Sequence, residues 1–144
     1  MDYNELAADL LDHMRSLHTE RPQKFIIESL QGEAFVLFFI AQQCCGVVPG
    51  EIGCAMHVSS ARIAQTLNSM ENKGWITRRI DTGDRRRILV ELTPEGKNAA
   101  DTHQRAVIGL AAKMLRLLGE HDAREYVRIM GRLTRAIPLI EELR

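Results

Sequence analysis

Aromatic residues are scarce in this chain of 144 residues: one Trp, two Tyr and four Phe account for 5% of it. Hydrophobic residues nevertheless make up 45% of the chain, and most are Leu, Ile, Ala, Val and Met, which suits a mainly helical core. A chain of this length is one domain by size and buries about two thirds of its unfolded surface. We therefore predict a single, mainly α (α+β) domain over residues 1–144.

The sequence pattern also predicts no disulfide framework, no membrane span and no export signal. The three cysteines, Cys44, Cys45 and Cys54, are odd in number and lack the spacing of a disulfide framework. The longest apolar run, residues 34–41, is far too short to cross a bilayer. Acidic rather than basic residues follow Met1, so no signal peptide is expected. These features predict a cytoplasmic protein with reduced thiols and no membrane partner.

Catalytic motifs are absent as well. The sequence contains no nucleophile elbow, no phosphate-binding loop and no HExxH pair of metal ligands. We therefore expect a protein that is not an enzyme and that needs no cofactor.

Net charge is zero, because 19 Lys and Arg balance 19 Asp and Glu. Taken alone, this balance argues against a nucleic-acid-binding protein. The charges are unevenly spread, however: residues 1–58 hold three basic against eight acidic residues, residues 59–97 hold eight against five, and residues 98–144 hold eight against six. A local patch matters more for binding than the total, so the middle of the chain is the candidate for contact with an anionic partner.

The densest basic cluster lies in residues 84–93, where three adjacent arginines lead into an apolar segment. The segments 75–80 and 88–92 are rich in β-branched and apolar residues, as strands are. Between them, Thr82 and Gly83 suit a turn, and Gly83 can adopt the positive φ that hairpin turns need. We predict a two-stranded hairpin with a cationic tip.

Two helices precede this hairpin. A proline fits the first position of a short helix over residues 49–56, and Ser59 or Ser60 caps a second helix that ends at Gly74. Helix, turn, helix and basic hairpin, over residues 47–97, form the layout of a winged helix-turn-helix, which places its second helix in a DNA major groove. In that second helix the predicted inward stripe is Ile63, Leu67 and Met70, and the side chains predicted to point outward are Ala61, Arg62, Gln65, Asn68 and Ser69.

Further helices are predicted from apolar residues at helical spacing. Gly46 is expected to end one of them and Gly119 another. Pro138 must kink the last helix or end its regular part, because it lacks an N–H and crowds the preceding turn. The predicted helices cover residues 3–19, 33–45, 94–118 and 122–143.

The apolar stripes at both ends of the chain exceed what one small winged domain can cover. Pairing with a second copy would bury them, and dimers with two-fold symmetry are the commonest soluble oligomers. We therefore predict a homodimer, formed through the helical regions 1–30 and 98–144.

The winged stretch carries four short motifs, which begin at Pro49, Leu67, Asp84 and Leu92. With these motifs it resembles the MarR family of bacterial transcription regulators. Its motifs cover about a third of the chain, in the family's order and spacing. The resemblance implies a homodimeric DNA-binding regulator, a repressor released by a small-molecule effector, whose first and last helices form the dimer interface. The motifs that carry it are Pro49-Gly50-Glu51-Ile52, Leu67-x-x-x-Glu71-x-Lys73-Gly74-Trp75-Ile76, Asp84-x-Arg86 and Leu92-Thr93-Pro94-x-Gly96.

In this interpretation double-stranded DNA is the partner and the second helix reads its major groove. Ser59 and Ser60, at the helix N-terminus, suit a phosphate group. One turn further, Arg62 can pair with guanine and Gln65 with adenine, at about 1–3 kcal/mol of discrimination each. Two copies related by a two-fold axis imply a near-palindromic operator.

The three arginines at the hairpin tip have different predicted roles. Arg85 and Arg87 are expected to contact phosphates. By the resemblance, Arg86 matches the family's wing arginine, which enters the minor groove, and Asp84 matches the acid that orients this arginine without touching DNA. Narrow, A·T-rich minor grooves attract such an arginine through their deeper negative potential.

Other interpretations remain open. Winged helices also serve as protein-interaction modules that bind no DNA. Cys44, Cys45 and Cys54 would suit a thiol sensor, although free cysteines are commonly small buried hydrophobes. Cys54-x-x-His57 puts two metal ligands one helical turn apart, but the sequence completes no tetrahedral set, so no metal site is predicted. No motif identifies the residues that bind an effector.

Overall fold

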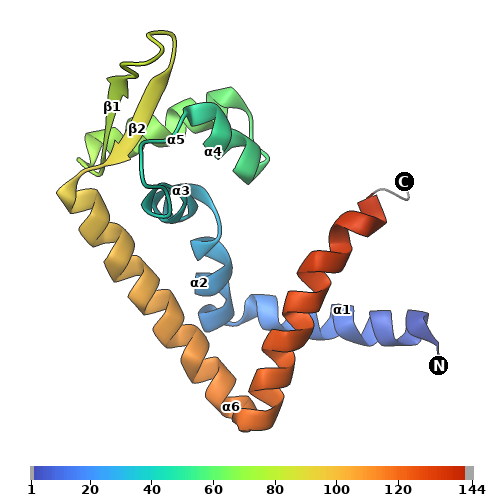
Figure 1. Ribbon diagram of the computed structural model, residues 1–144. Helices are drawn as coiled ribbons and strands as arrows, with labels where there is room; N and C mark the ends of the chain where they lie inside the picture. Colours follow the sequence, from blue (N-terminus) through green and yellow to red (C-terminus); the bar gives the residue numbers. More distant parts are fainter. Residues whose placement is uncertain (1, 142–144) are drawn as a thin grey trace. The chain divides into compact units, whose positions relative to one another are not determined.

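The computed structural model describes the backbone of residues 2–141 and the side chains of residues 2–138 (Figure 1). Contacts divide the chain into two compact units, Met1–Val107 and Ile108–Arg144. The first unit holds five helices, a hairpin and the beginning of α6, and the second holds the rest of α6. The elements are α1 (Tyr3–Thr19), α2 (Arg21–Ser29), α3 (Gly32–Ala41), α4 (Pro49–Met56), α5 (Ser60–Asn72), β1 (Ile76–Ile80), β2 (Ile88–Leu92) and α6 (Pro94–Glu141).

The winged helix-turn-helix predicted within residues 47–97 is present, in α4, α5 and the β1–β2 hairpin. The predicted inward stripe of α5 is buried, since Ile63, Leu67 and Met70 are each at most 2% exposed. Burying a side chain of this size contributes about 1.5–3 kcal/mol, so the inner face fixes the position of α5. The rest of this core comes from α3, α4, α6 and the hairpin: Val36, Leu37, Ile40, Val47, Ile52, Ile76, Val90 and Ala100.

The hairpin is antiparallel, with Ile76 opposite Leu92 and Ile80 opposite Ile88. Its strands match the predicted segments to within one residue. A third segment joins the other side of β2, where Val47 and Val90 exchange two backbone hydrogen bonds of 2.9 and 2.8 Å. This bridge attaches the start of α4 to the hairpin.

The turn at the hairpin tip differs from the prediction, because Gly83 does not adopt a positive φ. The chain instead reverses between Asp84 and Arg87, where the Arg87 N–H donates to the Asp84 carbonyl at 3.0 Å. Two aspartate side chains each accept the N–H two residues further on, Asp81 from Gly83 and Asp84 from Arg86, both at 3.0 Å. Aspartate turns of this kind replace the glycine turn that the sequence suggested.

α3 is shorter than the helix predicted over residues 33–45. It ends at Ala41, so Gly46 does not end it, and Cys44 and Cys45 lie in the following loop. The physical reason is the bridge to β2, since a helix that continued to residue 45 would carry Val47 away from Val90. Neither this apolar helix nor any other in the described part of the chain is long and apolar enough to cross a membrane.

The sequence pattern does not predict α2. Pro22 does mark the end of α1, which stops at Thr19 as predicted. The same proline then occupies the first turn of α2, where its missing N–H leaves no hydrogen bond unmade. A proline that ends one helix thus begins the next.

Gly119 interrupts α6 as predicted, with φ 78° and ψ 165°. The residues on both sides are helical, and the helix continues past Pro138 to Glu141, so this proline does not end it. The predicted end at residue 143 lies outside the described residues.

Gly96, the last residue of the Leu92-Thr93-Pro94-x-Gly96 motif, is required by a close approach of two backbones. It is buried in the first turn of α6, and a Cβ there would lie 1.9 Å from the carbonyl oxygen of Trp75. The same oxygen accepts the N–H of Thr93 at 3.0 Å, and Thr93 Oγ1 accepts the N–H of Gly96 at 3.0 Å. The start of α6 is therefore seated directly on the segment between α5 and β1.

Gly96→Ala should lower the free energy of unfolding by about 2–3 kcal/mol, because backbone rather than a mobile side chain must move. Gly50→Ala is the matched control, since a Cβ at Gly50 meets nothing within 4 Å. In the helix α4 this second change should stabilise the protein by about 0.5–1 kcal/mol. Urea unfolding followed by circular dichroism measures both. Equal midpoints for Gly96→Ala and the wild type would contradict the close approach.

Candidate nucleic-acid interface

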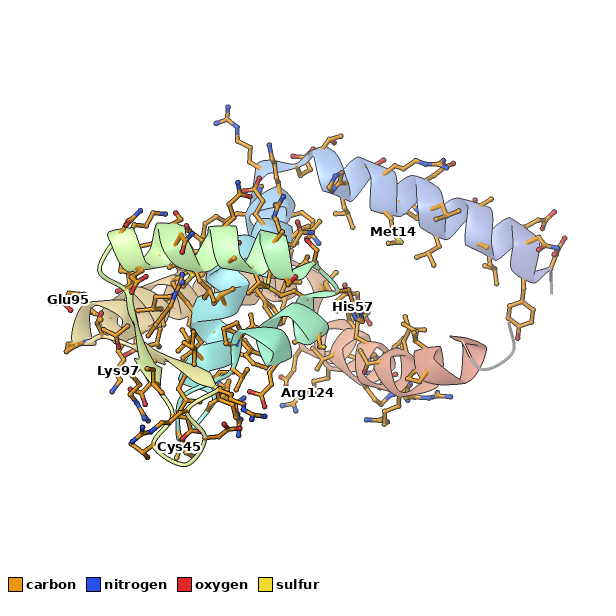
Figure 2. All side chains as sticks on the ribbon, turned by 90° about the horizontal axis from the view of Figure 1, so that it is seen from above. Met14, Cys45, His57, Glu95, Lys97 and Arg124 are labelled. Carbon is orange, nitrogen blue, oxygen red and sulfur yellow. The ribbon has the colours of Figure 1, made fainter. Side chains whose placement is uncertain are left out.

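A sharp turn and a serine cap build the N-terminus of α5. α4 ends at Met56, and the next residue, His57, has a left-handed φ of 54° that reverses the chain (Figure 2 labels His57). Ser59 then caps α5, because its Oγ accepts the N–H of Arg62 at 3.2 Å. Ser60 is the first residue of α5 and is exposed. Both serines therefore lie beside the N–H groups that a helix start offers to an anion.

The outer face of α5 agrees with the prediction over its first two turns. Arg62 and Gln65 are exposed, and the ion pairs of the described residues do not include Arg62. Ser69, predicted to point outward, is an exception, because its Oγ donates to Glu33 Oε1 of α3 at 2.6 Å. α5 therefore turns this side of its C-terminal half toward α3, and the exposed strip is narrower than predicted.

The hairpin tip presents Arg85, Arg86 and Arg87, all exposed. Arg85 and Arg86 occupy the turn itself, beyond the ends of the strands. Arg87 is weakly held, with Nη1 3.8 Å from Asp81 Oδ2. Within the described part of the chain, Arg85 and Arg86 form no ion pair, so both guanidinium groups are available to a ligand.

Asp84 acts on the backbone of the tip. Its Oδ1 accepts the N–H of Arg86, and its carbonyl accepts the N–H of Arg87, each at 3.0 Å. Asp84 therefore shapes the turn that carries Arg86. That it also orients the Arg86 side chain toward DNA stays a prediction.

The arginines on β1 are engaged, in contrast to those at the tip. Arg79 Nη2 donates to Glu91 Oε1 across the hairpin at 2.9 Å, and this hydrogen bond raises the pKa of Arg79 and lowers the pKa of Glu91. Arg78, on the other face of β1, donates from Nη2 to Asn68 Oδ1 of α5 at 2.7 Å. The sequence does not predict either pair, because spacing along one strand does not identify a partner on another element.

Glu33 fixes the C-terminal half of α5 to α3. One carboxylate oxygen accepts from Ser69, and the other accepts from Lys73, whose Nζ also lies 4.8 Å from the ring centre of Trp75. Burial acts to raise the pKa of Glu33, but the hydrogen bonds from Lys73 and Ser69 and the charge of Lys73 together lower it below the ordinary 4.5. Glu33 is therefore ionised at neutral pH and anchors α5.

The three cysteines are exposed rather than buried. Cys45 lies in the loop after α3 (Figure 2), and Cys44 lines a cleft together with Lys97 and Asp101. Among the described side chains, no three His, Cys, Asp or Glu gather closely enough to hold a metal ion.

A capped helix with an exposed outer face, joined to a hairpin with free arginines at its tip, defines a winged helix-turn-helix protein. Residues 31–88 match the MarR family. The transcriptional repressor MprA of Escherichia coli K12 is 29% identical over 94 residues, covering 63% of this chain and 53% of MprA. The chain thus spans about half the length of the curated relatives it matches.

Solved structures share the fold. The YusO protein of Bacillus subtilis has a TM-score of 0.72 at 23% identity, covering 94% of this chain and 99% of that one. FabT of Streptococcus pneumoniae, solved in complex with DNA, has a TM-score of 0.62 at 21% identity, covering 99% and 100%. The predicted mainly helical fold with a small winged hairpin is therefore confirmed.

The Glu33 anchor predicts a pH-dependent contribution to stability. A carboxyl whose pKa is lowered by folding stabilises the protein above its unfolded pKa, and this stabilisation is lost as the pH falls through the folded value. Glu33→Gln should therefore lower the free energy of unfolding by about 1 kcal/mol at neutral pH, and the difference should shrink as the pH falls through the folded pKa of Glu33.

Urea unfolding across this pH range measures the effect. Glu28→Gln is the matched control, because Glu28 is 63% exposed and lies 3.9 Å from Lys24. Its substitution should change little at any pH. A Glu33→Gln effect that is constant with pH would show that the ionised carboxylate is not the stabilising species.

Proposed function

We propose that this chain is a sequence-specific DNA-binding transcription regulator, a cytoplasmic homodimer that represses by occupying an operator and is released by a small ligand. The observation that carries the proposal is that Arg62 on α5 and Arg85 and Arg86 at the hairpin tip are exposed and unpaired among the described residues, whereas Arg78 and Arg79 between them are engaged. A winged module that binds protein has no need for two free cationic elements so placed.

α5 is the element proposed to enter the major groove. Arg62 can donate two hydrogen bonds to guanine O6 and N7, and Gln65 can pair with adenine N6 and N7. Ser59 Oγ already accepts the Arg62 N–H, so its hydroxyl proton remains to donate to a phosphate. Ser60 supplies a second hydroxyl at the same helix start.

The hairpin is proposed to supply contacts on the minor-groove side. Arg86 enters the groove, and its position depends on the turn that Asp84 closes. Arg85 contacts a phosphate. Arg87 can do the same, because its 3.8 Å contact with Asp81 is an exposed ion pair of little strength.

The relatives support a regulatory role. MprA is named a transcriptional repressor, and FabT was solved bound to DNA. Both likenesses are distant, so the operator contacts proposed here rest on the residues of this chain.

Two apolar stripes support a homodimer, one in each unit. α1 has no buried residue, and its stripe of Leu6, Leu10, Met14 and Leu17 is 47–58% exposed (Figure 2 labels Met14). Contiguous apolar surface of this kind marks an interaction site, and a second copy would cover it. The dimer would place two α5 helices on half-sites about one helical turn apart. The stripe in the second half of α6 comprises Tyr126, Met130, Leu133 and Ile137, which are 43–53% exposed.

A cavity of about 270 Å³ between α2, α3 and the start of α6 is the proposed effector site. Its walls are mostly apolar, and His103 lines it with an Nε2 that is buried without a hydrogen-bond partner in the described part of the chain. A small aromatic acid would place its ring on the apolar wall and its oxygen at this nitrogen. α3 forms one wall of this cavity and carries Glu33, which bonds to α5. A ligand bound in the cavity can therefore shift α5 and change the distance between the two α5 helices of the dimer.

A thiol-sensing regulator of the same fold is the second candidate. Cys44, Cys45 and Cys54 are all exposed, so an oxidant can reach their thiols, whereas buried structural cysteines are inert. In that case hydrogen peroxide rather than an aromatic acid such as salicylate would release the DNA.

Arg86→Ala tests the wing. Fluorescence anisotropy should detect wild-type binding to DNA from upstream of the protein's own gene, with a log–log salt slope of about −5 to −7 if a dimer neutralises about 6–8 phosphates. The variant should bind about tenfold more weakly at every A·T-flanked site, because it lacks the minor-groove guanidinium. Its melting temperature should not change.

Arg124→Ala is the control, because it removes the same charge from an exposed residue of α6 (Figure 2). It should leave affinity unchanged. Wild-type protein that gives no salt-sensitive binding to any promoter fragment would overturn the proposed function. If the wild type binds and Arg86→Ala binds equally well, only the proposed minor-groove contact of the hairpin is wrong.

Gln65→Ala tests the reader helix. The variant should lose base preference at one or two positions of each half-site, while affinity for sequences already mismatched there stays the same. A panel of operators with single base-pair substitutions measures this. An equal loss on every operator would identify Gln65 as a phosphate contact instead.

A further inference from the structure

We propose that Arg78 is a positioning residue for DNA sequence preference, because it fixes which atoms of Asn68 face the major groove. The inference rests on the proposed DNA-binding function. Nothing in the motifs of the sequence indicates it, since Arg78 lies on a strand and Asn68 on a helix.

Arg78 extends from the core-facing side of β1 to α5. It pairs with buried Val90 in the hairpin register, so both side chains lie on the face of the hairpin that covers the core. Only 28% of its side chain is exposed. Its Nη2 donates to Asn68 Oδ1 at 2.7 Å, and its Nε lies 3.5 Å from Glu71 Oε2.

This contact determines the orientation of the Asn68 amide. A guanidinium group has only donors, so the amide atom that faces Arg78 must be the oxygen. The Nδ2 group then points away from Arg78. Toward a partner on the side away from Arg78, Asn68 therefore presents two N–H donors, while one of the two lone pairs of Oδ1 is taken by Arg78.

Asn68 lies where it can contact a base edge. It is exposed on α5 and lies three residues after Gln65, so the two side chains are neighbours on the helix surface. An unrestrained asparagine prefers adenine, because it accepts from N6 and donates to N7 together. With Oδ1 turned toward Arg78, the side of Asn68 that faces away presents the Nδ2 donors, which suits guanine O6 or N7 and thymine O4 and disfavours cytosine, whose N4 is a donor.

The neighbouring Arg79 provides a matched comparison. It is the same residue type on the same strand, but it faces the other way and pairs with Glu91. A variant at Arg79 loses an arginine and an ion pair from the hairpin without touching Asn68. It therefore separates a general loss of hairpin stability from release of the Asn68 amide.

The experiment selects binding sites from a pool of duplex DNA of random sequence, at low salt, with the full-length protein. Arg78→Met keeps much of the aliphatic length and removes the donors. It should gain a preference for adenine of about fivefold or more at one base pair of each half-site, because Asn68 Oδ1 is released. Arg78→Lys keeps a donor and should retain the wild-type preference, as should Arg79→Met.

A double variant identifies the residue responsible. If Asn68 makes the new contact, Arg78→Met combined with Asn68→Ala should lose the gain for adenine. Persistence of the gain in this double variant would overturn the inference, and so would identical preferences for Arg78→Met and the wild type. A wild-type protein that enriches no sequence would instead overturn the proposed function.

Asn68→Ala alone decides the matter if Arg78→Met does not fold, which a thermal melt would reveal. This variant should lose the discrimination against cytosine at one base pair of each half-site. Unchanged discrimination at every position would show that Asn68 does not read the DNA, and would overturn the inference.

Discussion

The backbone around Trp75 is the contact on which the arrangement of the winged unit depends. Its N–H donates to the Met70 carbonyl at 3.0 Å, and its own carbonyl accepts from Thr93 at 3.0 Å. Thr93 Oγ1 also donates to the carbonyl of Gly74 at 2.5 Å. The end of α5, the base of the hairpin and the start of α6 thus share neighbouring peptide groups. Because these bonds join the backbones directly or through the short Thr93 side chain, a movement of the start of α6 would be passed to α5 and to the hairpin.

The two halves of α5 differ in how many side-chain contacts hold them to the rest of the protein. The C-terminal half is fixed by Glu33 through Ser69 and Lys73, and by the bond between Arg78 and Asn68. The N-terminal half, with Arg62 and Gln65, has its buried stripe and the Ser59 cap beneath it but an unoccupied outer face. The outer face of the N-terminal half is therefore open to a ligand, while the anchored C-terminal half adjoins α3, which lines the cavity, and holds Asn68 in one orientation.

Local chemistry accounts for what the sequence predicts well. A serine cap, a proline at a helix start and a glycine at a helix end each act within a few residues, and the starts of α4 and α5 and the interruption at Gly119 follow from them. The exposure of Arg62, Gln65 and Arg86 follows from helix period and turn position. Ser69 is predicted incorrectly because its partner Glu33 lies 36 residues away. The wing turn is missed because aspartate side chains, rather than Gly83, close it.

The zero net charge misleads for a related reason. The arginines of the winged unit fall into two groups according to their position in the fold. Those on β1 are engaged by Glu91, Asn68 and Glu71. Those on α5 and at the tip form no ion pair among the described residues, apart from the weak contact of Arg87. The net charge is zero because the acidic surplus of residues 1–58 offsets the basic surplus of the rest of the chain. A DNA phosphate responds to the free guanidinium groups and not to the total. Whether an arginine on the hairpin is engaged or free depends on which face of a strand it occupies. The register of the hairpin shows this, and a sum of charges does not.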